Sequence, residues 1–383
     1  MRILFTLHYP LDPNAGAAGY TLRLAEALRQ IGNDVEVVGA TRLFKHLGKR
    51  PAELCFPFAA TARSLRSLTL QPHDVIDCST GDLWPCPRSV VRRLGGITVT
   101  RSHGLEHIES QELLKAAERG EVKVRRRYSV YYGGIHLKQV ARSLRVAEGA
   151  IFCNESDRRF AVDRLGIEES RAFFVRAGVA DYFLGLPRPR SSKGVAPRIA
   201  VVGPYVWRKG AVTASSALSR ILREWPLARA SWLGASREAV LARFDPDVRE
   251  RVRVVSQYPN TDLPALLQDH HILLVLSRSE GFPGVILEGM ASGVAIIASD
   301  VPGPRDILSG TGAGILVPPG DPERVVKEVG LLLNDRTLLD GLRQKSHQLA
   351  QNYRWRDVAA ENLEIYNRLL ERKLARKGIR RSG

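Results

Sequence analysis

The sequence predicts an α/β protein with two Rossmann-like domains, each built on a doubly wound parallel sheet. Short apolar segments alternate with amphipathic helical segments through both halves of the chain, and this alternation is typical of βαβ units. The 383 residues are enough to bury two separate hydrophobic cores. Between the halves, at 186–198, proline, serine and basic residues replace apolar ones and indicate a linker. We therefore expect an N-terminal domain over 1–185 and a C-terminal domain over 186–353.

The first domain is expected to contain short buried strands separated by helices. The predicted strands are 2–7, 34–39, 74–79, 96–102 and 149–154. Helical periodicity covers 20–32 after the first strand and 155–166 after the last. A long Arg-rich helical stretch over 108–147 is interrupted at Gly133 and Gly134, because glycine is unfavourable inside a helix.

The same alternation starts again after the linker. The predicted strands of the second domain are 198–204, 228–235, 251–257, 271–277, 294–300 and 313–319. Amphipathic segments between them, such as 210–225, are expected to be helices that cover the sheet. Two such domains are expected to face a central cleft at the carboxyl ends of their strands. The last helix, about 354–383, is expected to pack back onto the first domain.

The chain carries a formal net charge of +17, which favours contact with a polyanion. The basic residues concentrate in the segments 42–50, 119–128, 137–145 and 368–381. Neither zinc-finger spacing nor an RNA-binding aromatic motif accompanies them, so an anionic membrane surface ranks above nucleic acid as a partner. The alternative is an Arg-rich surface that is solvated and has no partner.

The sequence indicates a cytoplasmic protein. No segment approaches the apolar length needed to span a bilayer, and the N-terminal apolar run is too short for a secretory signal. The four cysteines show no CxxC spacing, so neither a zinc site nor a disulfide framework is indicated. Together with the basic segments, these features support the hypothesis of peripheral contact with the inner face of the cell membrane.

The most informative stretch is SEGFPGVILEGMASG, at 279–293, which follows the apolar segment 272–277. The order predicts a buried strand, a glycine-rich loop and a helix with Pro283 in its first turn. Glu280 is then in the loop and Glu288 inside the helix. If both were helical, eight positions would separate them by roughly 12 Å, which is too far to share a proton. The two carboxylates are therefore expected to have different roles.

Several blocks together resemble the retaining glycosyltransferases of family 4, which have the GT-B fold, and they cover nearly the whole chain. The blocks are NAGAAGYTLRLAEALRQIGNDVEVV (14–38), TRSHGLEH (100–107), FCNESDRRFAVDRLGI (152–167), RKG (208–210), SRSEGFPGVILEGMASGVAIIASDVPGPRDIL (277–308) and GILVPPGDPE (314–323). The spacing of Glu280 and Glu288 alone occurs by chance, whereas the Gly-Phe-Pro-Gly core between them, beside the other blocks, is specific. The resemblance implies transfer of a sugar from a nucleotide diphosphate donor to a hydroxyl acceptor.

The motif residues suit a nucleotide sugar, in which a diphosphate joins a sugar to a ribose. Backbone N–H groups around Phe282 and Gly284 open a helix and suit an anionic diphosphate. Glu288 can accept hydrogen bonds from ribose hydroxyls and Glu280 can face the sugar, and the resemblance implies the same roles. The predicted donor-binding residues are Gly16, Gly203, Arg208, Lys209, Glu280, Gly281, Phe282, Pro283, Gly284, Val285 and Glu288. The alternative is that Glu280 is a surface loop residue and Glu288 a solvated helix residue.

The resemblance also implies which residues are catalytic. His103, at the end of a predicted strand, matches a family histidine that contacts the transferred sugar. Lys209 matches a family lysine. Relatives commonly have an arginine where this chain has Pro204, and Arg208 is the nearest side chain long enough to supply that charge to the diphosphate. The expected catalytic residues are His103, Glu280, Lys209 and Arg208.

A glycine loop, from Gly16 to Gly19, follows the first strand and precedes a helix. It lacks the GxGxxG spacing, so a nicotinamide cofactor is disfavoured. In the family the equivalent loop lines the cleft opposite the donor diphosphate and the acceptor, and we expect Gly19 and Glu106 to bind the acceptor. The alternative for the loop is a tight turn that contacts no substrate.

No metal or other cofactor is expected, since the nucleotide sugar is a substrate. Asp245 and Asp247 have the Asp-x-Asp spacing that holds a divalent cation in a different glycosyltransferase fold, but the proline between them indicates a turn. His270 and His271 are interpreted as structural residues.

The sequence and the resemblance together predict a metal-independent glycosyltransferase that retains the anomeric configuration. By resemblance, the leaving phosphate oxygen takes the acceptor proton, and the protein contributes positioning and electrostatic stabilisation. The expected donor is a UDP- or GDP-sugar, and the expected acceptor is a glycan or lipid-linked hydroxyl in polysaccharide, glycolipid or cell-envelope synthesis. Two alternatives stay open: a GT-B epimerase or hydrolase of nucleotide sugars, and a basic protein that binds nucleic acid without catalysis.

Overall fold

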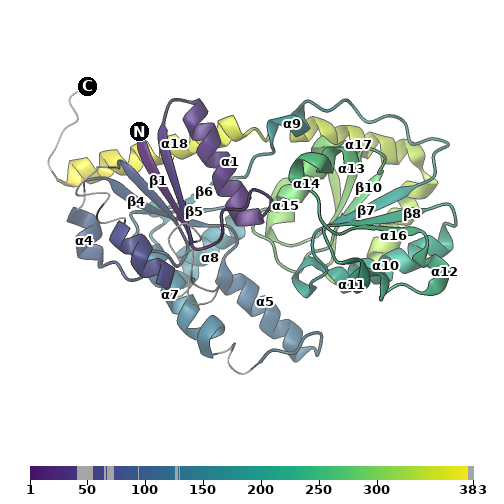
Figure 1. Cartoon of the computed structure of the whole chain (residues 1–383), viewed down its shortest axis with the longest axis horizontal. Coiled ribbons are helices and arrows are strands. Elements are labelled where there is room, and N and C mark those ends of the chain that lie inside the picture. The colour runs from purple at the N-terminus through teal and green to yellow at the C-terminus, as the bar shows by residue number, and fades with distance from the viewer. Residues whose placement is uncertain are drawn as a thin grey trace. The chain divides into compact units, whose positions relative to one another are not determined.

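The computed structural model describes residues 1–40, 55–63, 66, 73–93, 95–125, 128 and 130–377. The chain divides into a first unit, Met1–Ala177 together with the chain from Trp355 onward, and a second unit, Gly178–Arg354 (Figure 1). Each unit has its own parallel sheet, so the prediction of two Rossmann-like α/β domains is confirmed. The basic segment 42–50 lies outside the described residues.

The first unit is built on six parallel strands in the order β2-β1-β3-β4-β5-β6. The strands are β1 (Arg2–Leu7), β2 (Asp34–Gly39), β3 (Val75–Ser79), β4 (Ile97–Ser102), β5 (Gly149–Phe152) and β6 (Ala172–Phe174). β3 and β4 are buried along their whole length, as expected for a parallel sheet covered on both faces. The five predicted strands are present, whereas β6, with three residues, is too short to show a periodic pattern.

Helices connect the strands of the first unit. They are α1 (Gly16–Gln30), α4 (Arg88–Arg93), α5 (Glu106–Glu118), α7 (Leu137–Val146), α8 (Glu155–Leu165) and α18 (Trp355–Arg376). The Asn154 side chain caps α8 by accepting a hydrogen bond from the Asp157 N–H, and the helix ends at Gly166, whose φ is +68°. The predicted interruption at Gly133 and Gly134 is a π-helix, Tyr131–His136, that leads directly into α7.

The C-terminal helix α18 belongs to the first unit and packs against α1 and β4. Lys373 is buried there, where its Nζ donates to the Gly96 carbonyl at 2.6 Å and lies 2.8 Å from Glu148 Oε1. Gly149, the first residue of β5, leaves room for Leu369, because a Cβ at Gly149 would lie 2.5 Å from Leu369 Cδ1. Side chains near the end of the chain therefore complete the core of the first unit.

The second unit is built on six parallel strands in the order β12-β11-β10-β7-β8-β9. The strands are β7 (Arg198–Val202), β8 (Arg229–Leu233), β9 (Val252–Val255), β10 (Ile272–Val275), β11 (Ala295–Ser299) and β12 (Gly314–Val317), and all six were expected from the sequence. In chain order this is the 3-2-1-4-5-6 arrangement of a Rossmann sheet, which reverses between β7 and β10. Ligands of such sheets bind at the carboxyl ends of the strands at that switch point.

Helices cover both faces of the second sheet. They are α9 (Asp181–Leu184), α10 (Ala211–Glu224), α11 (Arg237–Leu241), α12 (Pro246–Arg249), α13 (Leu263–Leu267), α14 (Gly284–Ala291), α15 (Pro302–Leu308), α16 (Pro322–Asn334) and α17 (Arg336–Ala350). Alternate residues of β10 enter opposite cores, since Ile272 and Leu274 pack with α10 and α16, and Leu273 and Val275 pack with α14.

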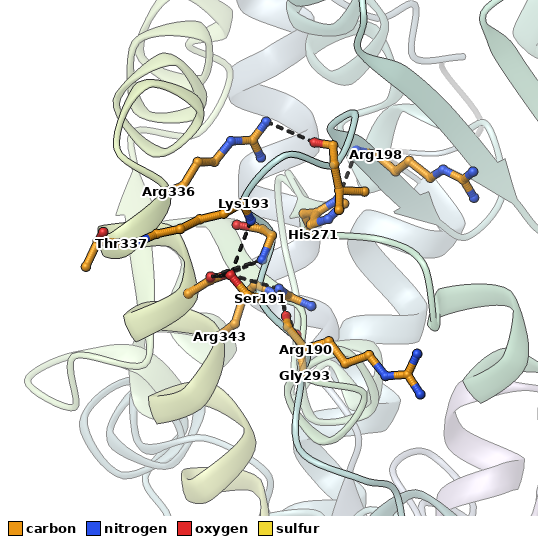
Figure 2. Close-up of polar contacts among 12 residues, drawn as sticks. Arg190, Ser191, Lys193, Arg198, His271, Gly293, Arg336, Thr337 and Arg343 are labelled. Atoms are coloured by element: carbon orange, nitrogen blue, oxygen red, sulfur yellow. Dashed lines mark hydrogen bonds and ion pairs between the residues drawn. The ribbon is translucent and has the colours of Figure 1, made fainter.

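The segment 186–198, predicted to be a linker, belongs to the second unit and is hydrogen-bonded to it. Asp340 on α17 accepts a hydrogen bond from Ser191 Oγ at 2.9 Å. Arg343, only 5% exposed, donates to the Arg190 carbonyl at 2.7 Å (Figure 2). These partners lie about 150 residues further along the chain, so the local composition of the segment cannot reveal them.

The chain instead enters the second unit after Ala177, eight residues before the predicted boundary at 185. Just inside this unit, the Val179 N–H donates to the Tyr353 carbonyl at 2.8 Å, and Val179 forms a parallel bridge with Arg354. The entering and leaving segments of the second unit are therefore hydrogen-bonded side by side.

Candidate functional site

Lys209, Arg208 and Glu280 come together where the second sheet reverses its strand order. Lys209 Nζ lies 2.5 Å from Glu280 Oε1, and Arg208 Nη1 lies 3.7 Å from Glu280 Oε2. Ser277 Oγ donates to Glu280 Oε1 at 2.7 Å. The two cations belong to the 3₁₀ turn Trp207–Lys209 after β7, and Glu280 follows the neighbouring strand β10. The structure thus joins three of the four residues predicted to be catalytic.

A close backbone approach holds this turn against the end of β10. Gly210 has a φ of +68°, and a Cβ at this position would lie 1.8 Å from the Leu276 carbonyl oxygen. Only glycine therefore fits. The Arg278 N–H also donates to the Arg208 carbonyl at 2.8 Å. The RKG segment consequently supplies both the charges and the backbone shape that places them.

The electrostatics of this cluster favour an anionic ligand. Burial alone would raise the pKa of Glu280, but the charges of Lys209 and Arg208, with hydrogen bonds from Lys209 and Ser277, lower it below its usual value. Glu280 is therefore a carboxylate at neutral pH. Two cations around one carboxylate leave an excess positive charge, and the Lys209 and Arg208 side chains stay 25% and 38% exposed.

Helix α14 begins beside this cluster with an uncapped end. Its N-cap is Pro283, one position earlier than the first-turn placement that the sequence suggested, and among the described residues no side chain caps the first turn. The first N–H groups of a helix lack intrahelical partners and suit an anion. Phe282 packs on the core, with its ring 6.3 Å from that of Tyr353, so the backbone around it is what a ligand can use. The predicted loop residues Gly281, Phe282, Pro283, Gly284 and Val285 form this loop and first turn.

Glu288 is the fifth residue of α14 and is partly buried. Asn260 Nδ2 donates to Glu288 Oε1 at 3.1 Å and to Tyr182 Oη at 3.2 Å. Burial, and then the charge of Glu288, raise the pKa of the Tyr258 hydroxyl. Asn260, Tyr182 and Tyr258 carry no motif, so the sequence offers no signal for them.

Gly203 directly follows β7 and has a φ of +124°. Its N–H donates to the Leu233 carbonyl at 2.7 Å, and its carbonyl accepts a hydrogen bond from Trp232 Nε1 at 3.0 Å. Both polar groups are thus engaged by β8. Pro204, the next residue, has no N–H to offer.

A second polar cluster lies at the carboxyl ends of β1, β3 and β4 in the first unit. His8 Nδ1 lies 2.8 Å from Asp82 Oδ1, and Thr6 Oγ1 donates to Asp82 Oδ2 at 3.1 Å. Thr80 Oγ1 donates to Glu106 Oε1 at 2.6 Å. The first sheet reverses its strand order between β1 and β3, so this cluster occupies its switch point.

His8 and Asp82 are candidate site residues that the sequence analysis missed. His8 directly follows the first strand, and a polar residue at the carboxyl end of a central strand is a usable signal. Asp82 lies 74 residues further on, and no sequence pattern pairs it with His8.

His103 follows β4 in the same unit, and its Nε2 lies 3.5 Å from Thr21 Oγ1. Burial, and then the charges of Arg101 and His8, lower the pKa of His103 to about 3. The imidazole is therefore neutral at pH 7 and can exchange hydrogen bonds with a sugar hydroxyl without adding charge.

The two carboxyl groups of this cluster are also poorly suited to carry charge. Burial raises the pKa of Glu106 and that of Asp82, although Thr80 bonds to the first and His8 to the second. Among the described residues, buried Glu106 Oε2 has no hydrogen-bond partner. A protonated Glu106 can donate from this oxygen to a hydroxyl of a ligand.

The two ends of the glycine loop differ in the space around them, which is tight at Gly19 and open at Gly16. A Cβ at Gly19 would lie 2.6 Å from the Pro13 carbonyl oxygen, so the tight packing of the loop already requires glycine there. Gly16 is the first residue of α1, and a Cβ there would meet no atom within 4 Å. Gly16 belongs to the first unit, whereas the other predicted donor-binding residues lie in the second.

Asp245 and Asp247 lie at the start of α12, where Arg223 on α10 pairs with both carboxylates. Arg223 Nε lies 2.9 Å from Asp247 Oδ2. The pair is thus an exposed turn neutralised by an arginine. Within the part of the chain that the structure describes, no three His, Cys, Asp or Glu side chains gather as a metal site.

His270 and His271 are buried at the start of β10, at the opposite edge of the sheet from Glu280. His271 Nδ1 accepts a hydrogen bond from the Arg198 N–H at 3.1 Å (Figure 2). Burial lowers the pKa of each imidazole to about 4. Both are neutral packing residues, in agreement with the structural interpretation.

Comparisons with known proteins match this arrangement. Residues 196–335 match the family model described as Glycosyl transferases group 1. The D-inositol 3-phosphate glycosyltransferase of Jonesia denitrificans is 32% identical over 146 residues, which are 37% of this chain and 33% of that protein. The chain therefore spans about a third of the length of this curated relative.

Two solved structures share the fold. Sucrose-phosphate synthase from Thermosynechococcus elongatus matches with a TM-score of 0.72 at 18% identity, covering 96% of this chain and 99% of that one. Anabaena HepE in complex with UDP-glucose matches with a TM-score of 0.68 at 15% identity, covering 95% and 99%.

Proposed function

We propose that the chain is a group 1 glycosyltransferase that transfers a hexose from a nucleotide diphosphate sugar to a hydroxyl acceptor with retention of anomeric configuration, a proposal that the family match over 196–335 and the GT-B fold support. The observation that carries this proposal is the cluster of Lys209, Arg208 and Glu280 at the switch point of the second sheet, beside the uncapped start of α14. A UDP- or GDP-sugar is the proposed donor, and the structural neighbour HepE, solved with UDP-glucose, supports this class.

The donor would be held along the loop and helix that follow β10. The first turn of α14 supplies N–H groups to the diphosphate, and Lys209 and Arg208 supply positive charge. Glu280, kept ionised by these cations, accepts hydrogen bonds from hydroxyls of the sugar. Glu288 accepts hydrogen bonds from the ribose.

Arg208 is proposed to compensate for Pro204. A proline after β7 offers neither a charge nor an N–H, while the diphosphate gains negative charge as the glycosidic bond breaks. Arg208 reaches the same carboxylate as Lys209, from a turn fixed by Gly210. A second cation is therefore available in this cluster.

Transfer would proceed on one face of the sugar. The bond between the anomeric carbon and the diphosphate oxygen breaks, the acceptor oxygen forms its bond to the same carbon, and the acceptor proton passes to the leaving phosphate oxygen. The protein then needs no general base, metal or cofactor, and contributes positioning and charge. Neutral His103 contacts the sugar, and Glu106 with Gly19 lies on the acceptor side.

The acceptor is proposed to be a glycan or lipid-linked hydroxyl presented at an anionic membrane surface, in polysaccharide, glycolipid or cell-envelope synthesis. Residues 122–147 contain seven Lys or Arg and no Asp or Glu. On the outer face of α7, Lys138, Arg142 and Arg145 are exposed at helical spacing. Among the helices of the described residues, none is long and apolar enough to cross a bilayer.

Exposed apolar side chains lie directly before these cations. Val130, Tyr132 and Ile135, in and beside the π-helix, are 67%, 48% and 50% exposed. Aromatic and aliphatic side chains next to a basic helix face suit the interface of an anionic bilayer. This combination favours peripheral membrane contact of a cytoplasmic protein over binding to nucleic acid, since no base-stacking motif accompanies it.

A ligand screen followed by a transfer assay tests the proposal. One class among UDP-, GDP- and ADP-sugars should raise the Tm of the chain, since a ligand at 100 times its Kd adds roughly 2.7 kcal/mol to stability. Transfer with that donor should persist in EDTA and fall in Glu280→Gln, while Glu323→Gln on the surface of α16 should match the wild type.

Three results would contradict it. Donor consumption that does not depend on an acceptor would favour an epimerase or hydrolase. Loss of activity in EDTA with recovery in magnesium or manganese would overturn metal independence. Salt-sensitive nucleic-acid binding without any nucleotide-sugar effect would favour the non-catalytic alternative.

A further inference from the structure

The side chain of Tyr20 on α1 is surrounded by three groups from distant parts of the first unit. Its ring meets the His103 ring edge-on, with centroids 4.9 Å apart and planes at 71°. It meets the Trp355 ring in the same way, at 4.9 Å and 84°. The guanidinium of Arg101 lies 5.6 Å from the ring centroid. Tyr20 is only 7% exposed, so these contacts define its position.

Arg101 lies two residues before His103 on β4 and is 1% exposed. Its Nη2 donates to Asp77 Oδ2 at 2.5 Å and to Asn362 Oδ1 at 2.6 Å. Its Nη1 donates to Tyr20 Oη at 3.3 Å. The Tyr366 hydroxyl donates to the same Asp77 oxygen at 2.6 Å. Asn362 and Tyr366 are on α18, more than 260 residues from Arg101 in the chain.

Stability alone does not account for this network. A buried ion pair costs desolvation free energy, and apolar residues of similar volume often hold a core as well or better. Here the pair is surrounded by directional donors and acceptors, since both terminal nitrogens of Arg101 and the Tyr366 hydroxyl are hydrogen-bonded, although Arg101 Nε has no partner among the described residues. Such an arrangement holds the Arg101 side chain and its backbone in place. His103 follows two residues later, so its backbone is held in place as well.

We propose that Tyr20, supported by Trp355 and by the network of Arg101, Asp77, Asn362 and Tyr366, positions the imidazole of His103. This inference rests on the proposed role of His103 in sugar transfer. Neighbouring residues of α1 act together, because the Tyr20 ring blocks rotation of the imidazole while Thr21 Oγ1 lies 3.5 Å from its Nε2. Trp355 is the first residue of α18, so the start of this helix packs against the Tyr20 ring.

Tyr20→Leu tests this inference, with Tyr20→Phe as the conservative partner. Loss of the ring opens space beside His103, and a displaced catalytic group lowers turnover steeply. We expect kcat to fall about 10- to 100-fold in Tyr20→Leu with a smaller change in donor KM, because the residues proposed to hold the diphosphate and the ribose, Lys209, Arg208 and Glu288, are in the second unit. Tyr20→Phe keeps the ring and should recover most of this loss.

A spectroscopic measurement separates positioning from loss of structure. In histidine-labelled protein, with the signal assigned through His103→Gln, the wild-type imidazole should stay neutral down to acid pH because its pKa is about 3. In Tyr20→Leu, water reaches the ring, and the pKa should rise toward 6.5 although Arg101 and His8 still oppose it. This reading needs no activity, so it stands even if the proposed function fails.

Leu369→Ala is the matched control, since Leu369 packs on Gly149 from the same helix α18, fourteen residues after Trp355. It should lower the Tm but leave kcat and the His103 titration unchanged. Tyr366→Phe should produce a smaller version of the Tyr20→Leu effect through Arg101. The inference is overturned if Tyr20→Leu keeps both the wild-type kcat and the wild-type His103 titration, or if Leu369→Ala shifts both equally.

Discussion

The second unit gathers charge at the switch point of its sheet, whereas the first unit gathers groups whose charged forms burial disfavours. Around Glu280, Lys209 and Arg208 lower a carboxyl pKa in spite of burial. In the first unit, burial lowers the pKa of His103 to about 3 and raises that of Glu106. At the same edge of the same kind of sheet, a carboxyl pKa is thus lowered in one unit, whereas carboxyl pKa values are raised and an imidazole pKa is lowered in the other.

This difference supports the proposed roles of the two units. A diphosphate needs positive charge that is already in place, because it becomes more negative during the reaction. Sugar and acceptor hydroxyls are uncharged and are recognised by hydrogen bonds, which neutral imidazole and carboxylic acid groups can make. Fold alone does not separate the two roles, since both units are doubly wound parallel sheets.

Removing charge from the second unit should have the largest effect. Lys209→Ala deletes a cation and leaves Glu280 without its 2.5 Å partner. One charge-assisted contact is worth about 1.5–3 kcal/mol, so kcat should fall about 10- to 150-fold if the contact acts in the transition state. Arg208→Ala should lower kcat comparably, as measured by steady-state kinetics.

Lys327→Ala, at an exposed position of α16, is the control and should behave as wild type. Near-normal turnover in Arg208→Ala would mean that Arg208 does not compensate for Pro204. Near-normal turnover in both Lys209→Ala and Arg208→Ala would show that the positive charge of the second unit does not contribute to the reaction.

Glu288→Gln should have a smaller effect, confined to donor binding. The amide keeps the shape of the side chain and its contact with Asn260, but it accepts hydrogen bonds without a charge. Loss of about 1.5 kcal/mol corresponds to roughly tenfold weaker binding of the nucleotide diphosphate, measured by calorimetry. An unchanged Kd would remove Glu288 from the ribose site.

Because His103 is held neutral in the folded protein, the stability of the protein is expected to depend on pH. Its folded pKa of about 3 lies below its ordinary 6.5, so the unfolded chain takes the proton first as pH falls. The stability that follows from the neutral imidazole is present above about pH 6.5 and is lost as pH drops toward 3. Relative to His103→Gln, the wild type should lose up to about 1.4 kcal/mol of unfolding free energy per pH unit between about pH 6 and 4. A constant difference in chemical unfolding across this range would show that His103 is not held neutral.

The smallest expected effect concerns the basic face of α7. Lys138→Ala removes one exposed cation, worth about 1 kcal/mol at an anionic surface or roughly fivefold in binding. Sedimentation with phosphatidylglycerol–phosphatidylcholine vesicles should show this loss at low salt, and Lys327→Ala should not. Equal binding to pure phosphatidylcholine vesicles would leave the face as solvated surface.

Most strands and the residues of the Lys209, Arg208 and Glu280 cluster could be predicted from the sequence, because they follow local patterns. Buried parallel strands are short apolar runs, and the RKG and EGFPG segments each follow such a run. That Lys209 and Glu280 meet follows from the strand order, since β7 and β10 are neighbours in a sheet that reverses there.

The remaining features depend on partners far apart in the chain. His8 meets Asp82 across 74 residues, and the segment 186–198 is held by Asp340 and Arg343 about 150 residues later. The composition of this segment predicted a linker because its residues are polar. No local pattern shows that they form hydrogen bonds with Asp340 and Arg343. Burial, which raises the carboxyl pKa values and lowers the His103 pKa in the first unit's cluster, is likewise a property of the folded sheet and not of the motif.

The anomeric configuration of the first product tests the central claim most directly. With an α-linked nucleotide sugar as donor and a hydroxyl acceptor, ¹H NMR during the first turnovers reports the new linkage through its anomeric coupling. A retaining transferase that positions both substrates without a general base predicts an α-linked product that forms only when acceptor is present. A β-linked product, or free sugar released at the same rate without acceptor, would contradict the account.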